Sequence, residues 1–293
     1  MGVQREDLPI KERGRKASKG RLCQWIQEKG EEENLLTYNV IKDTPNGYIL
    51  YNQFDEYVGK SIEKYADYQV EETKFFEHFV SEGDTVLDIG ANIGTHTLWF
   101  ANKVGKRGKV LAFEPQRLVF QTLCANMALN SVQNVDCKNL AVGSSQMLLD
   151  VPVLDPEVPT NFGGLSLRGQ LQGEKVAVCR IDDIGLTQCD FIKIDVEGME
   201  PEVLLGGFDT IARLRPFIYI EIDRTENNPE ILDTFNKLEY IVTQHNPPLY
   251  SEDYEGDNVF GNIVSINAMC VPSEMMGNKE MLNGGSDSGK KAQ

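Results

Sequence analysis

The residues whose types and spacing point to chemistry begin with an acid beside a glycine-rich turn. Asp88 lies at the end of an apolar run, just before the segment Gly90-Ala91-Asn92-Ile93-Gly94. A second apolar run ends in Glu114, twenty residues after Gly94. Glycines in such a turn let a ligand approach the main chain, and an acid at the tip of the second strand can accept hydrogen bonds from both hydroxyls of a ribose. The spacing therefore predicts a nucleoside-type cofactor site.

The pattern of the turn favours S-adenosylmethionine over a dinucleotide. A dinucleotide fingerprint reads G-x-G-x-x-G and holds a pyrophosphate at a helix N-terminus. Here Asn92 takes the place of the middle glycine, and the last glycine comes one residue early. S-adenosylmethionine has no phosphate but carries an ammonium and a sulfonium, which Asp88 and the loop carbonyls can face. We therefore predict this cofactor, with a nicotinamide cofactor as the disfavoured alternative.

Composition and charge restrict the class of protein. The 293 residues, 41% of them hydrophobic, are enough for a sizeable core. No apolar run approaches the ~20 residues of a membrane helix, and no secretion signal is visible. The six cysteines form no C-x-x-C pair, which predicts reduced thiols in a cytoplasmic protein. The net charge of −16 disfavours a nucleic-acid partner, so we expect a small-molecule or peptide substrate and no membrane partner. The oligomeric state stays open.

The order of apolar runs and helical patterns predicts an α/β fold. Alternating strands and helices imply a mostly parallel sheet with helices on both faces, and we expect its last strand at Asn262–Ile266. In such sheets the ligand lies beyond the carboxyl ends of the strands, where Asp88, Glu114, Asp195 and Glu221 are expected. The boundaries that we predict are a flexible charged leader at 1–33, an N-terminal hairpin or cap at 34–66, the main domain at 67–272 with an insertion at 147–180, and a disordered tail at 273–293.

Five short motifs resemble those of one enzyme family. They are D-I-G-A-N-I-G at 88–94, F-E-P at 113–115, N-L-A-V-G at 139–143, I-D-D-I at 181–184, and K-I-D-V-E-G at 193–198 with Glu200. In this order and spacing they resemble the FkbM family of class I methyltransferases, over about residues 68–225. The resemblance implies a Rossmann-like, seven-stranded fold and S-adenosylmethionine as methyl donor. It also implies methylation of a hydroxyl on a sugar, polyketide or other natural product.

The expected cofactor site combines the glycine turn with residues from neighbouring strand ends. We expect Asp88 to hold the amino group of the cofactor and Glu114 the ribose hydroxyls. Tyr68 and Glu71 are expected to close over the cofactor, with an ordinary helix surface as the alternative. The residues assigned to the cofactor are Tyr68, Glu71, Asp88, Gly90, Asn92, Gly94, Glu114, Asn139, Leu140, Ala141 and Asp195.

Methyl transfer requires an aligned and activated acceptor, and Asp195 and Glu197 are the candidates for that task. The alternative is that they only bind cofactor or cap the following helix. His96 is a further candidate base, with a packed or cofactor-lining histidine as its alternative. The residues assigned to the substrate are Asn161, Gly163, Gly164 and Glu221.

Two alternatives stay open at this stage. The acids at the strand ends, with Asp223, offer the oxygen ligands that magnesium favours, but no histidine pair supports a transition metal, and we expect no metal. The reaction itself is most simply O-methylation. N-methylation of an amide or amine, including one in a peptide, is the alternative among enzymes, and a catalytically silent S-adenosylmethionine-binding protein is the alternative outside them.

Overall fold

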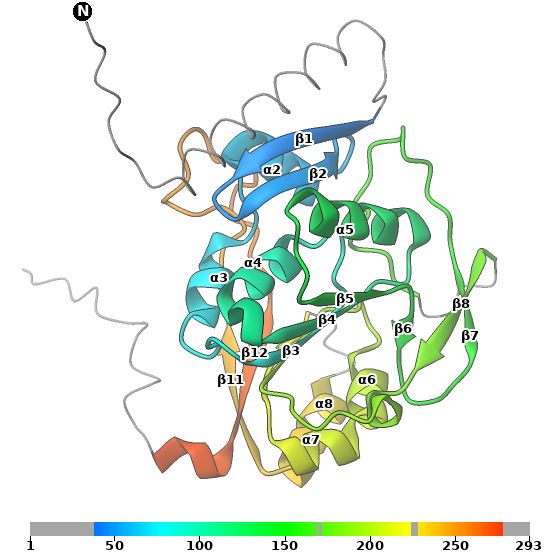
Figure 1. Cartoon of the computed structure of the whole chain (residues 1–293), viewed down its shortest axis with the longest axis vertical. Helices are drawn as coiled ribbons and strands as arrows, with labels where there is room; N and C mark the ends of the chain where they lie inside the picture. Colours follow the sequence, from blue (N-terminus) through cyan, green and yellow to red (C-terminus); the bar gives the residue numbers. More distant parts are fainter. Residues whose placement is uncertain (1–37, 168, 170–171, 224–227, 278–293) are drawn as a thin grey trace, which may run out of the picture.

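A computed structural model describes residues 38–167, 169, 172–223 and 228–277 (Figure 1). The expected leader at 1–33 and the end of the expected tail lie outside these residues. A seven-stranded sheet forms the centre of the molecule. Its strands, in spatial order, are β11 (Tyr240–His245), β12 (Asn267–Pro272), β10 (Phe217–Glu221), β9 (Phe191–Ile194), β3 (Thr85–Ile89), β4 (Lys109–Phe113) and β5 (Val135–Lys138).

The sheet is parallel except for one strand. β12 runs antiparallel to both of its neighbours, β10 and β11, and the pairs between β3, β4, β5, β9 and β10 are parallel. The central strands are apolar on both faces, as is typical of parallel strands covered on both sides. The predicted α/β, mostly parallel seven-stranded fold is confirmed.

Helices cover both faces of this sheet, and strand alternation decides which residues meet which helix. Leu87 and Ile192 pack with the helices of one face, whereas Val86 and Phe191 pack with those of the other. On the first face lie α6 (Glu200–Gly206), α7 (Phe208–Leu214) and α8 (Asn228–Lys237), and on the second lie α3 (Val70–Phe76), α4 (Thr95–Val104) and α5 (Arg117–Leu129). Two short 3-10 turns, η1 (Gly105–Arg107) and η2 (Ile181–Ile184), belong to the connections. Among the described residues, no helix is long and apolar enough to cross a bilayer.

The N-terminal cap is a hairpin followed by a helix, as expected for residues 34–66. It consists of β1 (Asn39–Thr44), β2 (Gly47–Asn52) and α2 (Val58–Tyr65). Asn126 of α5 holds the hairpin in place: its side chain accepts the Leu50 N–H at 2.6 Å and donates to the carbonyls of Leu50 at 3.0 Å and Ile93 at 2.7 Å. Because Ile93 lies in the glycine turn, one buried amide joins the cap to that turn.

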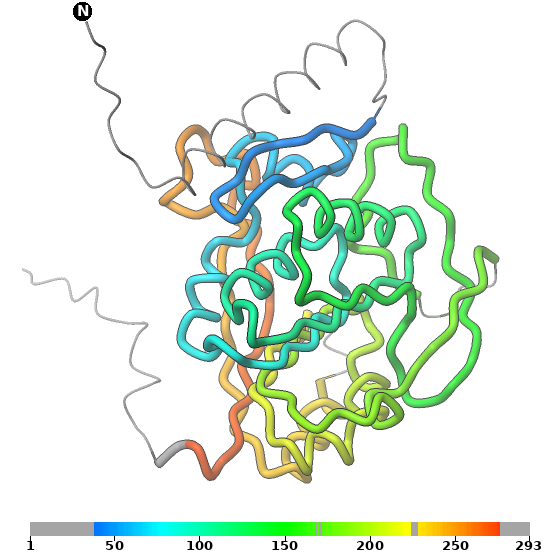
Figure 2. The backbone as a smooth tube through the Cα atoms, viewed as in Figure 1, coloured from blue at the N-terminus to red at the C-terminus, as the bar shows by residue number. Residues whose placement is uncertain are grey.

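The insertion forms a small second sheet beside the main one. β6 (Ala141–Val142), β8 (Glu174–Cys179) and β7 (Leu148–Val151) pair in this order, with β7 antiparallel to β8. Figure 2 shows this lobe in green at one side of the chain trace, and the orange loop between β11 and β12 reaching the blue cap on the other side. That loop is fixed to α2 by Tyr254, whose ring stacks on Tyr65 with centroids 4.5 Å apart.

Two expected boundaries are wrong. The last strand is Asn267–Pro272 and not Asn262–Ile266, because the continuous apolar run from Ala268 to Val271 is the one that can be buried between β10 and β11. The first residues of the expected disordered tail form the 3-10 turn η3 (Ser273–Gly277). Glu274 of this turn forms an ion pair with Arg215 at 2.7 Å, which holds the turn to the domain.

Replacing Asn126 with Ala should destabilise the protein by about 2–4 kcal/mol. The substitution leaves buried backbone groups of Leu50 and Ile93 without partners, and each such group costs about 1–3 kcal/mol. Urea denaturation followed by circular dichroism measures the change. The control is Asn102→Ala, which removes one exposed hydrogen bond and should cost less than about 0.5 kcal/mol. Equal effects of the two substitutions would contradict the role of Asn126.

Candidate active site

A cavity lies beyond the carboxyl ends of β3, β4 and β9. Residues of the glycine turn, of the tips of β4 and β6, of the insertion and of the segment after β9 line it: Ile89, Gly90, Phe113, Glu114, Pro115, Gln116, Leu140, Ala141, Val142, Gly163, Leu165, Leu167, Asp195, Val196, Glu197 and Met199. This is the edge at which an open α/β sheet binds its ligand.

Close packing around the glycine turn explains part of its sequence. Gly90 has a φ of +81°, and a Cβ atom there would lie 1.7 Å from the carbonyl oxygen of Asp195, so β3 and β9 can approach only if this residue is glycine. Gly94 has a φ of +89°, and a Cβ there would meet the Leu123 side chain at 2.5 Å. Asn92 shares the left-handed conformation with a φ of +52°. That these three residues surround the methionine part of the cofactor stays a prediction.

Glu114 is buried at the tip of β4 and lines the cavity. Its carboxylate accepts the N–H of Asn92 at 2.9 Å and the N–H of Gln116 at 2.8 Å, so it braces the glycine turn. Burial raises the pKa of Glu114 to about 7, against the opposing effect of these two hydrogen bonds. Asn139 supports the same strand tip by donating to the carbonyls of Glu114 at 2.9 Å and Pro115 at 3.0 Å.

The walls beside Glu114 fit an adenosine. Leu140 and Ala141 line the cavity next to it and offer an apolar surface for a base. Gly163 of the insertion lines it as well, and a Cβ atom there would lie 2.5 Å from the Asn92 amide nitrogen. Asn161 shapes this turn by accepting the N–H groups of Gly163 at 3.1 Å and Gly164 at 2.9 Å. The insertion therefore lies against the glycine turn, and the substrate role assigned to its residues stays a prediction.

Asp88 lies beneath the cavity and is fully buried. The Thr97 hydroxyl donates to Asp88 Oδ2 at 2.6 Å, whereas Asp88 Oδ1 has no hydrogen-bond partner and lies 3.8 Å from the Lys193 ammonium. Burial raises the pKa of Asp88, and Lys193 and Thr97 oppose the shift. The charge that faces Asp88 Oδ1 is therefore that of Lys193, and the role expected for Asp88 at the amino group of the cofactor stays a prediction.

His96 is packed in the core, which was the alternative to its role as a base. Its ring lies among those of Tyr68, Phe76 and Phe100, and burial, together with the charge of Lys193, lowers its pKa well below the usual value. Its Nε2 lies 3.5 Å from Glu72 Oε2 without a hydrogen bond. The histidine is thus held neutral in the core, and a catalytic role for it remains untested.

Tyr68 and Glu71 lie in different environments. Tyr68 packs against His96, and burial followed by the charges of Asp195 and Glu72 raises its pKa. Glu71 instead forms an ion pair with Lys74 at 2.9 Å and accepts a hydrogen bond from Ser251 of the loop between β11 and β12. Its contacts are those of the helix surface named as the alternative, and its role at the cofactor stays a prediction.

Lys193 and Glu72 are the residues that the sequence reasoning missed. Both are buried next to the strand ends, and the Lys193 ammonium lies 3.2 Å from Asp195 Oδ2. Glu72 accepts a hydrogen bond from Asn267 at 2.8 Å, and burial raises its pKa to about 8. A signal was available for Lys193, since a lysine between isoleucines in a buried parallel strand requires an opposite charge nearby.

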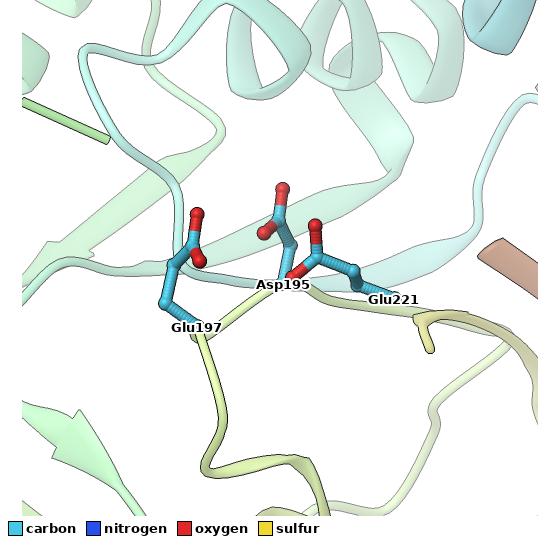
Figure 3. Close-up of side chains that lie close together, drawn as sticks. All are labelled: Asp195, Glu197 and Glu221. Carbon is cyan, nitrogen blue, oxygen red and sulfur yellow. The ribbon is translucent and has the colours of Figure 1, made fainter. Parts of the chain in front are cut away.

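Three carboxylates gather at the ends of β9 and β10 (Figure 3). Oxygens of Asp195, Glu197 and Glu221 lie within 4.8 Å of one another. Burial, followed by the charges of Asp195 and Glu197, raises the pKa of Glu221 to about 10, so Glu221 is neutral at physiological pH. Lys193 balances Asp195. The three acids also have the spacing of metal ligands, and the absence of a metal stays a prediction.

The segment after β9 makes a sharp turn that positions two of these acids. Glu197 has a φ of +54° and Gly198 a φ of +108°. Glu200 stabilises the turn by accepting the Gly198 N–H at 3.0 Å, close to the start of α6. Asp195 and Glu197 are the acids of this segment that line the cavity.

Comparison with known proteins agrees with this geometry. Residues 88–242 match the family described as Methyltransferase FkbM domain. The chain belongs to this family. Methyltransferase sdnD of Sordaria araneosa is 28% identical over an alignment of 155 residues, which covers 41% of this chain and 59% of that protein. This chain thus spans less than two thirds of the length of that relative.

Solved structures show similarities at low sequence identity. The structure of Methyltransferase FkbM from Methylobacillus flagellatus KT is 19% identical, with a TM-score of 0.45 over 64% of this chain and 44% of that one. The fibrillarin of Aeropyrum pernix, solved with bound S-adenosylmethionine, is 15% identical, with a TM-score of 0.39 over 66% of this chain and 68% of that one.

The cofactor of this FkbM methyltransferase domain is S-adenosylmethionine. The residues that line the cavity suit this cofactor, because the Glu114 carboxylate can accept hydrogen bonds and Leu140 and Ala141 form an apolar wall beside it. This agreement of family and geometry confirms the predicted cofactor, while the contact of each residue with it remains to be measured.

Replacing Glu114 with Ala should weaken the binding of S-adenosylhomocysteine by about 10- to 100-fold, because two hydrogen bonds to a charged acceptor are lost. Isothermal titration calorimetry measures the dissociation constant. Glu82→Ala, which removes an exposed carboxylate with 63% of its side chain accessible, is the control and should leave the affinity unchanged. An unaltered affinity of the Glu114→Ala protein would remove Glu114 from the ribose site.

The affinity for S-adenosylhomocysteine should fall as the pH is lowered through 7. The pKa of Glu114 is raised to about 7, and protonation below that pH removes the negative charge that accepts the ribose hydroxyl hydrogens. Between pH 8 and pH 6 the dissociation constant should rise about tenfold. Glu114→Gln removes the titrating group, so its pH profile should be flatter over this range. Parallel profiles for the two proteins would show that another group is responsible.

Proposed function

We propose that this domain methylates a hydroxyl group of a small molecule, such as a sugar or polyketide, with Asp195 as the residue that receives or orients the hydroxyl proton. The position of Asp195 carries the proposal. Its carboxylate lines the cofactor cavity and at the same time belongs to the group of acids at the ends of β9 and β10. These two features support a role for Asp195 at the methyl acceptor.

The cofactor supplies an electrophilic methyl group on sulfur. When bound, the cofactor would provide the methyl carbon that the acceptor oxygen attacks and the sulfur that leaves with the electron pair of the broken bond. The Asp195 carboxylate would accept the proton of the hydroxyl and orient its oxygen. Glu221, neutral and mostly buried, is placed to donate a hydrogen bond to a polar acceptor. Tyr68 interacts electrostatically with Asp195 and Glu221.

One observation favours N-methylation as the second candidate. The carboxylates of Asp195 and Glu197 lie together at the mouth, and such a pair attracts an acceptor that carries an amine. The loop between β11 and β12 adds Glu252, Asp253, Glu255 and Asp257 on the same edge of the sheet. This acidic surface disfavours phosphate-rich acceptors, and we infer a neutral or cationic small molecule or peptide.

A methyl-transfer screen tests the proposed function. The purified protein is incubated with S-adenosylmethionine carrying a labelled methyl group and with panels of sugars, polyketides, amines and peptides, and mass spectrometry locates the added group. Label on a hydroxyl oxygen supports the proposal, and label on nitrogen supports the second candidate. Binding of S-adenosylhomocysteine without transfer to any member of the panels would contradict both and favour a silent binding protein.

Replacing Asp195 with Asn should lower kcat by about 10²- to 10⁴-fold, because the amide keeps the size of the side chain but cannot accept the proton. The affinity for S-adenosylhomocysteine, measured by calorimetry, should change less than about threefold. The substitution keeps the size of the side chain, and binding of the product involves no proton transfer. Asp209→Asn, an exposed substitution on α7, is the matched control. Full activity of the Asp195→Asn enzyme would exclude Asp195 from the mechanism.

A further inference from the structure

Lys193 occupies a costly position for a charged residue. It lies near the end of the central strand β9 with only 3% of its surface exposed. Its partners in register on the two flanking strands are Asp88 of β3 and Tyr219 of β10. Residues in register on parallel strands point to the same face, so these three side chains form a row across the sheet, on the face covered by α3 and α4. A buried cation is tolerated only when opposite charges surround it.

The ammonium of Lys193 contacts both acids of the site. Its Nζ lies 3.2 Å from Asp195 Oδ2, 3.8 Å from Asp88 Oδ1 and 3.5 Å from the carbonyl oxygen of Gly90. Thr97 satisfies the other oxygen of Asp88, so Lys193 is the charge that faces the unpartnered one. One side chain thus links the acid below the cofactor turn to the acid at the mouth.

The remaining titratable groups around Asp195 are acids, phenols and a neutral histidine. Lys193 is the cation that the described part of the chain pairs with this carboxylate. The groups that face Asp195 or lie next to it are Tyr68, Glu72, Asp88, His96, Glu197, Glu200, Tyr219 and Glu221. Without a cation, repulsion from the acids would turn Asp195 away or protonate it.

We propose that Lys193 is the positioning residue of the methyl-transfer site: it fixes the Asp195 carboxylate at the end of β9, while the same ammonium pairs with Asp88 beneath the cofactor turn. The inference rests on the proposed role of Asp195. A lysine suits the position because its compact ammonium can approach Asp195 and Asp88 at the same time.

Nuclear magnetic resonance of the aspartate side-chain carboxyl carbons tests the proposal directly and needs no acceptor. The Asp195 signal is assigned by its loss in Asp195→Asn, and its titration is recorded with bound S-adenosylhomocysteine. In Lys193→Met, which removes the charge and keeps a long apolar side chain, the midpoint should move to higher pH by more than about one pH unit. The control is Lys138→Met on β5, where the lysine pairs with Asp136 at 2.8 Å, and it should leave the Asp195 midpoint in place.

Kinetics provides the second readout, with an acceptor identified by the screen. Lys193→Met should lower kcat by at least about 100-fold and leave the KM for the acceptor within about threefold. Lys193→Arg, which keeps the charge, should recover at least about tenfold of that loss. An unchanged Asp195 midpoint in Lys193→Met, or a kcat within threefold of the unaltered enzyme, would overturn the proposal.

Two further measurements apply if the single variant does not fold or if the unaltered protein methylates nothing. If Lys193→Met does not fold, the double variant Lys193→Met with Asp88→Asn removes one buried charge of each sign, and it should show the same upward shift of the Asp195 midpoint; no shift contradicts the proposal. If the unaltered protein binds S-adenosylhomocysteine but methylates nothing, the proposed function fails by itself, and the titration still decides whether Lys193 controls Asp195.

Discussion

The buried ion pairs of Lys193 are the interaction on which the site depends. Parallel strands bring their carboxyl ends to one edge, and here this arrangement places Asp88 and Asp195 beside each other with glycine between the strands. Asp88 is fully buried and has lost its hydration, whereas 37% of the Asp195 side chain is exposed, so the ammonium of Lys193 compensates the buried charge and also pairs with the partly exposed one. Gly90 makes the approach of β3 and β9 possible, and Lys193 makes it electrostatically tolerable. Gly90 thus removes the steric obstacle to this approach, and Lys193 reduces the repulsion between the two acids.

Segments far apart in the chain then close around this centre. The cap is held to the glycine turn through Asn126, and the insertion lies against the same turn through Gly163. The loop between β11 and β12 stacks on the cap through Tyr254 and Tyr65. Because all three contacts lie around the strand ends, changes in the cap, the insertion or this loop would alter the acceptor space while the sheet stays the same.

Several acids of the site hold protons near neutral pH. Burial raises the pKa of Glu114 to about 7, that of Glu72 to about 8 and that of Glu221 to about 10. A group with a raised pKa in the folded state stabilises the fold below its unfolded pKa, and this contribution is lost as the pH rises through the folded value. The apo protein therefore loses stability from these groups between about pH 5 and pH 10.

The sequence by itself determined the sheet class, the turn at 88–94, the acid at Glu114 and the cofactor, because these depend on short segments whose order along the chain is the order of the fold. The last strand was misplaced, because the segment Asn262–Ile266 and the buried apolar run from Ala268 to Val271 both fit the local pattern of a strand. The sequence could not reveal that Lys193 lies between Asp88 and Asp195, that Glu72 rather than Glu71 turns into the core, or that Glu221 is neutral. Those facts depend on strand register, helix rotation and burial, and only the packed tertiary structure decides which charges lose water and which partner they find.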